Sequence, residues 1–162
     1  MRKGEKNILV GTAVVVLSFM AIKTYYISHE KTQDQGIPFY STASKTLQQK
    51  AATIIREKNC RDCHLLWAQR NIMQTVPAPS LDGIGSIRDE DWVYQYLSSP
   101  NPQSMLPSRL KEEFKMPSYA SLDEDTRRLL AKYISSLKVQ DWYLEETKKR
   151  EYEKLTGNKY TQ

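Results

Sequence analysis

The chain has 162 residues, of which 40% are hydrophobic and 27% charged. This composition excludes a polytopic membrane protein and a long disordered chain. The net charge of +5 is small and dispersed along the sequence, which argues against nucleic acid as a partner. Cys60 and Cys63 are the two cysteines of the chain, and cysteines so close in sequence exclude a framework of several disulfides.

The N-terminal segment predicts a membrane anchor. Ile8–Ile22 contains no charged residue, and basic residues precede it. A helix over residues 7–27 would span roughly 31 Å, enough to cross the core of a bilayer. Lys23 would lie near one end, where its long stem can carry the ammonium to the headgroups. The basic start predicts that residues 1–6 stay in the cytoplasm and that the rest of the chain is exported.

Two other interpretations of this segment stay open. An apolar run behind a basic start also fits a cleavable signal peptide, but no cleavage site with small residues follows it. A helix buried in a soluble core would place Lys23 inside the protein. We therefore expect an uncleaved anchor, followed by a polar tether over residues 28–44.

Apolar spacing and capping residues predict three helices in a domain over residues 45–139. The first is expected from Thr46 to about Lys58, and the second over Glu90 to Leu97 with Asp89 as its cap. The third follows Ser121-Leu122-Asp123-Glu124, which we interpret as a capping box that begins at Ser121.

No segment alternates with a period of two residues, so the sequence predicts an all-α chain. Residues 140–162 carry mixed charge. They are expected to form a helical tail, either on the surface of the domain or against a partner.

The sequence Cys60-Arg61-Asp62-Cys63-His64 has the sharpest chemical content in the chain. Two thiols at this spacing can add across the two vinyl groups of a haem, while the adjacent histidine brings its imidazole under the iron. A thioredoxin-like redox pair, half of a zinc site and chance are the alternatives. The redox pair needs a βαβ setting, and a structural zinc site needs a fourth ligand, for which only His29 remains. The motif therefore predicts one covalently attached haem c.

The iron would need a sixth ligand, and methionine is the candidate. Met73 follows His64 so closely that it would lie on the same side of the ring. Met105 and Met116 both lie in the irregular stretch before the last helix, as a loop that crosses the opposite face should. Pro117 stiffens the loop next to Met116. We predict Met116 as the axial ligand opposite His64, with Met105 as the second choice.

With these motifs the chain resembles the monohaem class I cytochrome c family over about residues 45–139. The resemblance rests on Cys60, Cys63 and His64, on Ala78-Pro79-Ser80-Leu81 where the family has Gly-Pro-x-Leu, on Met116-Pro117, and on Tyr133 in the last helix. It implies that the Pro79 carbonyl accepts the proton on the other nitrogen of His64. It also implies that the ring nitrogen of Trp92 can reach a haem propionate, although a plain core tryptophan is an equal alternative.

Ligation by histidine and methionine leaves no vacant position for a substrate, so the expected function is one-electron transfer and not catalysis. Peroxidase or sensor activity would require that Met116 does not bind the iron. An anchored thiol–disulfide oxidoreductase that uses Cys60 and Cys63 is the alternative from a different class.

The anchor, the short tether and the haem domain together resemble the membrane-bound cytochrome c subunits of nitric oxide reductases and haem–copper oxidases. This narrower likeness implies a subunit of a larger respiratory oxidoreductase in the bacterial inner membrane, with the haem domain on the periplasmic or extracytoplasmic side. The implied partners are the other subunits and a protein that donates or accepts electrons, with no small-molecule substrate. A free-standing tethered shuttle between complexes is the competing role.

Overall fold

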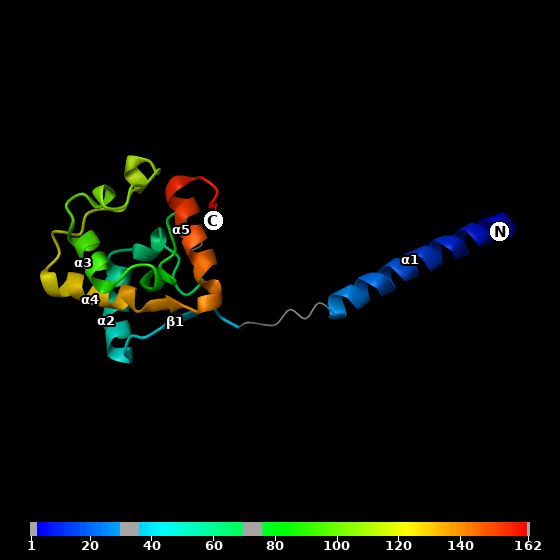
Figure 1. The fold of residues 1–162 in the computed structure, drawn as a ribbon, viewed down its shortest axis with the longest axis horizontal. Coiled ribbons are helices and arrows are strands. Elements are labelled where there is room, and N and C mark those ends of the chain that lie inside the picture. Colours follow the sequence, from blue (N-terminus) through cyan, green and yellow to red (C-terminus); the bar gives the residue numbers. More distant parts are fainter. Residues whose placement is uncertain (1–2, 30–35, 70–75, 162) are drawn as a thin grey trace. The chain divides into compact units, whose positions relative to one another are not determined.

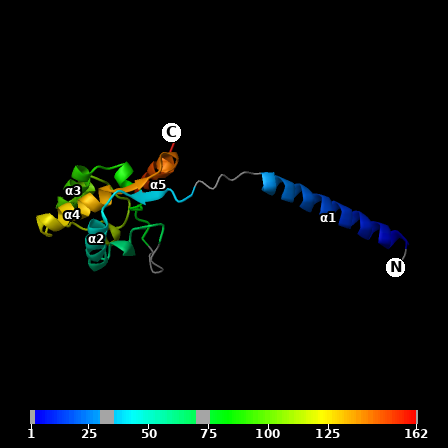
Figure 2. The same cartoon turned by 90° about the horizontal axis from the view of Figure 1, so that it is seen from below.

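The computed structural model describes residues 3–29, 36–69 and 76–161. It divides the chain into two compact units, Met1–Gly36 and Ile37–Gln162 (Figure 1). The first unit is built around one long helix, and the second is a mostly helical domain (Figure 2).

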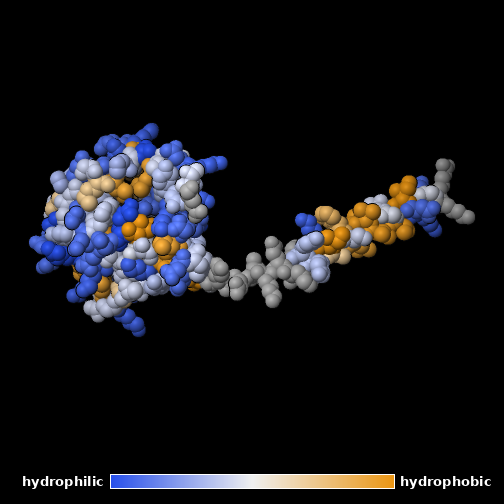
Figure 3. Space-filling view, viewed as in Figure 1, coloured by the Kyte–Doolittle hydropathy of each residue, from blue (hydrophilic) through white to orange (hydrophobic). Residues whose placement is uncertain are grey.

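The helix of the first unit, α1, extends over Lys3–His29. Its stretch Gly4–Tyr26 is long and apolar enough to cross a membrane, and none of that stretch is buried inside the protein. Apolar residues cover most of its surface (Figure 3). The hydroxyls of Thr12 and Thr24 donate to helix carbonyls one turn back, at 2.9 and 2.8 Å, so their polarity is satisfied within the helix. The exposure of α1 speaks against the buried core helix that the sequence left open.

Three helices form the frame of the second unit, close to where the sequence predicts them. They are α2 (Lys45–Glu57), α3 (Glu90–Ser98) and α4 (Glu124–Ser135). Ser44 caps α2 and Asp89 caps α3, each by accepting a hydrogen bond from a backbone N–H in the first turn. Both α2 and α3 pack against α4 (Figure 1).

The start of α4 differs from the prediction. Asp123 is the N-cap, because its Oδ1 accepts a hydrogen bond from the Thr126 N–H at 2.8 Å. Leu122 belongs to a preceding turn, in which its N–H donates to the Tyr119 carbonyl at 3.0 Å. The capping box beginning at Ser121 is therefore wrong, and the helix begins two residues later than that pattern implies.

A short antiparallel pair of strands adds to the helical layout. Phe39–Ser41 forms β1 and Leu137–Val139 forms β2, with Phe39 opposite Val139. The all-α prediction holds for the architecture but missed these strands, because three residues are too few to show an alternating pattern. The pairing also places the end of the predicted tether in the domain, which begins at Ile37.

The connecting segments contain short 3₁₀-helices. They cover Cys60–Asp62, Ile84–Ser86, Pro102–Ser104, Glu112–Phe114 and Asp141–Tyr143. Gly85 lies where the end of α4 approaches so closely that a Cβ would stand 2.0 Å from the Ser135 carbonyl oxygen. Only glycine fits that contact.

The core lies where α2, α3 and α4 meet. Ala51 on α2 is fully buried, and Tyr133 on α4 belongs to the same apolar cluster. Leu97 on α3 and Leu130 on α4 complete the contact between those two helices. Ala51 and Tyr133 thus place a small and a large side chain in the same core cluster, where α2 packs against α4.

The C-terminal tail folds onto the domain as α5 (Leu144–Thr156). Thr147 on its inner face is buried, and the backbone N–H of Arg109 donates to the Leu155 carbonyl at 3.4 Å. The helix ends at Gly157, which has a φ of 74° and so acts as a left-handed C-cap.

Candidate functional site

A cavity of about 350 Å³ in the second unit brings together residues that are far apart in the sequence. Its wall is mostly apolar and includes all the principal predicted site residues. These are Cys60, Cys63, His64, Pro79, Trp92 and Met116. Met105 does not line this cavity, and Met73 lies outside the described residues. Nothing is described of the side chain of His29.

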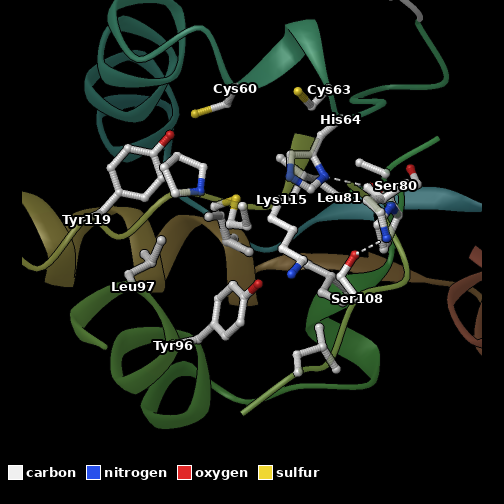
Figure 4. A pocket seen from close by; sticks show the side chains of 18 of the residues that line it. Cys60, Cys63, His64, Ser80, Leu81, Tyr96, Leu97, Ser108, Lys115 and Tyr119 are labelled. Atoms are coloured by element: carbon white, nitrogen blue, oxygen red, sulfur yellow. Dashed lines mark hydrogen bonds between the residues drawn. The ribbon is translucent and has the colours of Figure 1, made fainter. Parts of the chain in front are cut away.

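The turn after α2 positions the two thiols. Asn59 adopts a left-handed conformation with a φ of 53°, which ends the helix and starts the 3₁₀-helix at Cys60. The N–H groups of Cys63 and His64 then both donate to the Cys60 carbonyl, at 3.4 and 3.0 Å. In Figure 4 the sulfur atoms of Cys60 and Cys63 lie on the same side of the cavity, with His64 below them.

Both cysteines are thiols in this structure, and their surroundings keep them protonated. Burial raises the pKa of the Cys60 thiol, and burial together with the negative charge of Asp62 raises the pKa of Cys63. A thiol–disulfide oxidoreductase needs a cysteine with a lowered pKa, because the thiolate is the attacking group. The environment of this pair therefore disfavours the redox-pair alternative.

The imidazole of His64 is held by one strong hydrogen bond. Its Nδ1 donates to the Pro79 carbonyl at 2.7 Å, which fixes the tautomer and leaves Nε2 able to bind a metal (Figure 4). Burial lowers the pKa of His64, so the ring is neutral, as a ligand must be. The loop around Pro79 is tied to the residue after His64, because the Leu81 N–H donates to the Leu65 carbonyl at 2.9 Å.

Met116 reaches the cavity from the long segment between α3 and α4. The side-chain amide of Gln103 donates to the Met116 carbonyl at 2.9 Å and so fixes the backbone at this point. The Ser118 hydroxyl donates to the Ser99 carbonyl at 2.8 Å, which ties the following residues to the end of α3. Met105 is part of a turn, in which its N–H donates to the Pro102 carbonyl at 3.1 Å. Of these two methionines, Met116 is the one the fold brings to the cavity.

Trp92 lies in the cavity wall and also packs against the apolar core. Its ring stacks on that of Tyr96 with centroids 5.1 Å apart, and the guanidinium of Arg88 lies 4.9 Å from its centroid. The hydroxyl of Tyr96 lies across the cavity from the two cysteines in Figure 4.

Several lining residues were not predicted from the sequence. Tyr119 could have been found from the sequence, because it is the last residue of the Met-Pro-Ser-Tyr segment that begins at Met116. Burial, with the neighbouring Cys60 and Cys63 adding to it, raises the pKa of Tyr119 to about 12. Glu151 and Leu155 on α5 also line the cavity, and nothing in the mixed-charge tail marks them.

The chemistry of these groups fits a covalent haem. The cavity offers two thiols on one side, a neutral imidazole with one nitrogen available, and a thioether sulfur, all within a mostly apolar wall. Imidazole and thioether are the axial pair of electron-transfer haems. Among the described residues there is no group of three or more His, Cys, Asp or Glu side chains that could hold a metal ion.

Comparison with known proteins gives one match. The family model described as Cytochrome c matches residues 48–138, more than half of the chain. No curated protein and no solved structure matches the chain. The matched residues extend from α2 to β2, and they leave out both α1 and α5.

Proposed function

This chain belongs to the cytochrome c family, and we propose that it serves as a membrane-anchored subunit of a larger respiratory oxidoreductase. Family membership identifies an electron-transfer protein that carries haem c, attached covalently through Cys60 and Cys63. The axial ligands, the anchor and the partner complex are parts of the proposal.

We assign His64 and Met116 as the axial ligands of the iron. The observation that carries this assignment is the single cavity that joins the Cys-x-x-Cys-His segment to Met116. Haem iron supplies a centre that cycles between ferrous and ferric states. The chain keeps the ligands in place in both states, because the Pro79 carbonyl holds His64 and Gln103 holds the backbone at Met116. Small reorganisation favours rapid transfer, and two strong ligands leave no open position for a substrate.

Two features support a subunit more than a shuttle. The domain begins at Ile37, so seven residues separate it from the end of α1 at His29, a reach of roughly 25 Å when fully extended. The C-terminal segment also carries exposed aromatic side chains: Trp142 is 46% exposed and Tyr152 is 40% exposed. Exposed aromatic residues are typical of contacts between proteins. A shuttle between complexes would need a longer reach.

The carrier function is tested by covalent haem and by reversible redox chemistry. The purified chain should stain for haem peroxidase activity on a denaturing gel and titrate with one electron. A Cys60→Ala, Cys63→Ala double variant made in parallel should give no stained band. Absence of covalent haem from the native sequence, in cells with working haem-attachment machinery, would contradict the assignment.

The subunit role has its own experiment. We expect that purification in mild detergent brings down other membrane oxidoreductase subunits with the chain. A monomer that retains its haem and has no co-purifying partner would instead identify a tethered shuttle.

A further inference from the structure

The C-terminal helix brings a carboxyl group to the haem cavity. Glu151 lies on α5, beyond the residues that the family model matches, and it lines the same cavity as Cys60, His64 and Met116. Its side chain is only 11% exposed. It also lines a second cavity, of about 340 Å³, whose wall includes further residues of α5. A buried carboxyl group beside a redox centre has to be accounted for, because burial of a charge is costly.

Arg88 links this carboxyl group to α3. One nitrogen of its guanidinium lies 3.3 Å from the Glu151 Oε2, and the guanidinium lies over the ring of Trp92. The pair is incompletely satisfied: Glu151 Oε1 and Arg88 Nε are both buried and have no hydrogen-bond partner among the described residues. Buried polar atoms of this kind usually have a partner, so their environment is completed by another group or by a proton.

The position of the pair points to the polar edge of the haem. The thioether bonds to Cys60 and Cys63 fix the vinyl edge, and the propionates of a haem extend from the other edge. Tyr96 lies across the cavity from the cysteines (Figure 4) and stacks on Trp92, which in turn contacts Arg88. These contacts link Glu151 to the side of the cavity across from the cysteines, where the propionates of a bound haem would add negative charge.

We propose that Glu151 couples a proton to the electron that the haem carries. When the haem domain accepts one electron from its donor protein, the Glu151 carboxylate would take one proton from the solvent, so that an O–H bond of hydronium breaks as the O–H bond of the carboxylic acid forms. When the iron is oxidised, the acid returns the proton to water and the electron passes to the acceptor protein. Each electron is thus accompanied by one proton, so the net charge of the site stays the same. The proposal rests on the proposed function, because it requires a haem in the cavity.

The charges around Glu151 support this behaviour. Burial raises the pKa of Glu151, and the positive charge of Arg88 lowers it in part, so the two effects oppose each other. Ferric iron carries one more positive charge than ferrous iron, so reduction favours the protonated form. Arg88 contacts Glu151, and the other titratable side chains that share a cavity wall with it include Tyr96, Lys115, Asp82, Tyr143, Arg150 and Lys154. The cations among them favour the carboxylate, whereas Asp82 and the propionates favour the acid.

The test is the midpoint potential of the full-length protein in detergent as a function of pH. In the native protein we expect the potential to fall as pH rises through the range in which Glu151 titrates, with at most one proton taken up per electron. In Glu151→Gln this dependence should be lost, and at high pH the potential should stay above that of the native protein. Glu145→Gln is the matched control, because Glu145 is an exposed residue of the same helix that pairs with Lys148. It should behave as the native protein does.

A second measurement assigns the proton to Glu151. The infrared difference between reduced and oxidised protein should show a carboxylic acid carbonyl band that appears on reduction, is absent in Glu151→Gln and persists in Glu145→Gln. Arg88→Gln, in which Glu151 stays in place, should shift the pH range upward, because a neighbouring positive charge is removed. An unchanged pH dependence in Glu151→Gln, or a native potential that does not vary with pH, overturns the proposal. Loss of covalent haem from the native protein would instead contradict the proposed function.

Discussion

Asn59 and Pro79 each make one backbone contribution on which the haem ligands depend. The left-handed turn at Asn59 ends α2 just before the first thiol, so Cys60 and Cys63 face the same cavity. The Pro79 carbonyl then orients the imidazole of His64. Both effects come from the backbone of these two residues and not from their side chains. The backbone at Asn59 and Pro79 therefore positions the part of the site that holds the two thiols and the imidazole of His64.

We predict that Met116→Ala removes the sulfur–iron charge-transfer band and lowers the midpoint potential. Thioether ligation stabilises ferrous iron, and axial ligands shift haem potentials over a range of about 0.8 V. Loss of the partly buried side chain should also destabilise the fold by about 2 kcal/mol. Visible absorption, redox titration and denaturant unfolding measure these effects.

Met105→Ala is the matched control for this change. Met105 lies in the same irregular segment but does not line the cavity, so the band and the potential should be those of the native protein. If Met105→Ala lost the band and Met116→Ala kept it, the axial ligand would be Met105.

Sequence patterns reveal residues whose spacing the cofactor itself dictates. The separation of the vinyl groups and the iron requires Cys60, Cys63 and His64 at their positions, so a motif of five residues was sufficient. Glu151 could not be found in this way, because its approach to the cavity depends on how α5 packs. A glutamate among many charged residues has no local pattern that distinguishes it.

At the scale of elements, the cap of α4 shows two polar residues in competition. Ser121 and Asp123 are both good capping residues, and Ser121 has a glutamate at the right spacing. The turn that closes from Tyr119 to Leu122 decides between them, since it takes Leu122 out of the helix. The predicted helices were otherwise found because their apolar spacing extends over several turns. Strands of three residues give no such signal.

We predict that Asp123→Ala lowers the Tm of the haem-loaded protein by about 2–4 °C at pH 7. Ser121→Ala should leave the Tm unchanged, because Ser121 does not cap the helix. Hydrogen bonds from Thr126 lower the pKa of the Asp123 carboxyl. Its stabilising effect is thus present above the ordinary pKa of 3.8 and is lost as pH falls through the lower value in the folded state. The difference in Tm between Asp123→Ala and the native protein, measured by thermal unfolding, should therefore be smaller in strong acid than at pH 7. If Ser121→Ala lowered the Tm more than Asp123→Ala does, Ser121 would be the capping residue after all.

For the whole molecule, the chain divides into a unit built around one long apolar helix and a haem domain. The apolar helix and the haem domain could both be predicted, because each has its own strong pattern: an uncharged apolar run in one and a haem motif in the other. The boundary between them could not, because β1 is only three residues long and is recognisable as a strand only through its pairing with β2. The tail was expected to be helical, as α5 is, but its sequence did not show that Glu151 and Leu155 line the cavity.

We predict that a chain in which a cleavable signal replaces residues 1–36 is water-soluble and carries haem c. Its visible spectrum and midpoint potential should equal those of the full-length protein, because the cavity is built entirely from the second unit. Membrane fractionation and redox titration provide the measurements. The full-length protein should resist extraction by high salt and alkaline carbonate. A shortened chain that still sediments with membranes would show that α1 is not the main attachment.

The pairing of β1 with β2 also sets an order of events during biosynthesis. The first strand is made before Cys60 and the second after α4, so the domain cannot close until its far end has been synthesised. At about 5–20 residues per second, several seconds separate the synthesis of Cys63 from that of Val139. Until Val139 is available, β1 has no partner strand, so the segment that carries the two thiols belongs to a domain whose two ends have not yet paired.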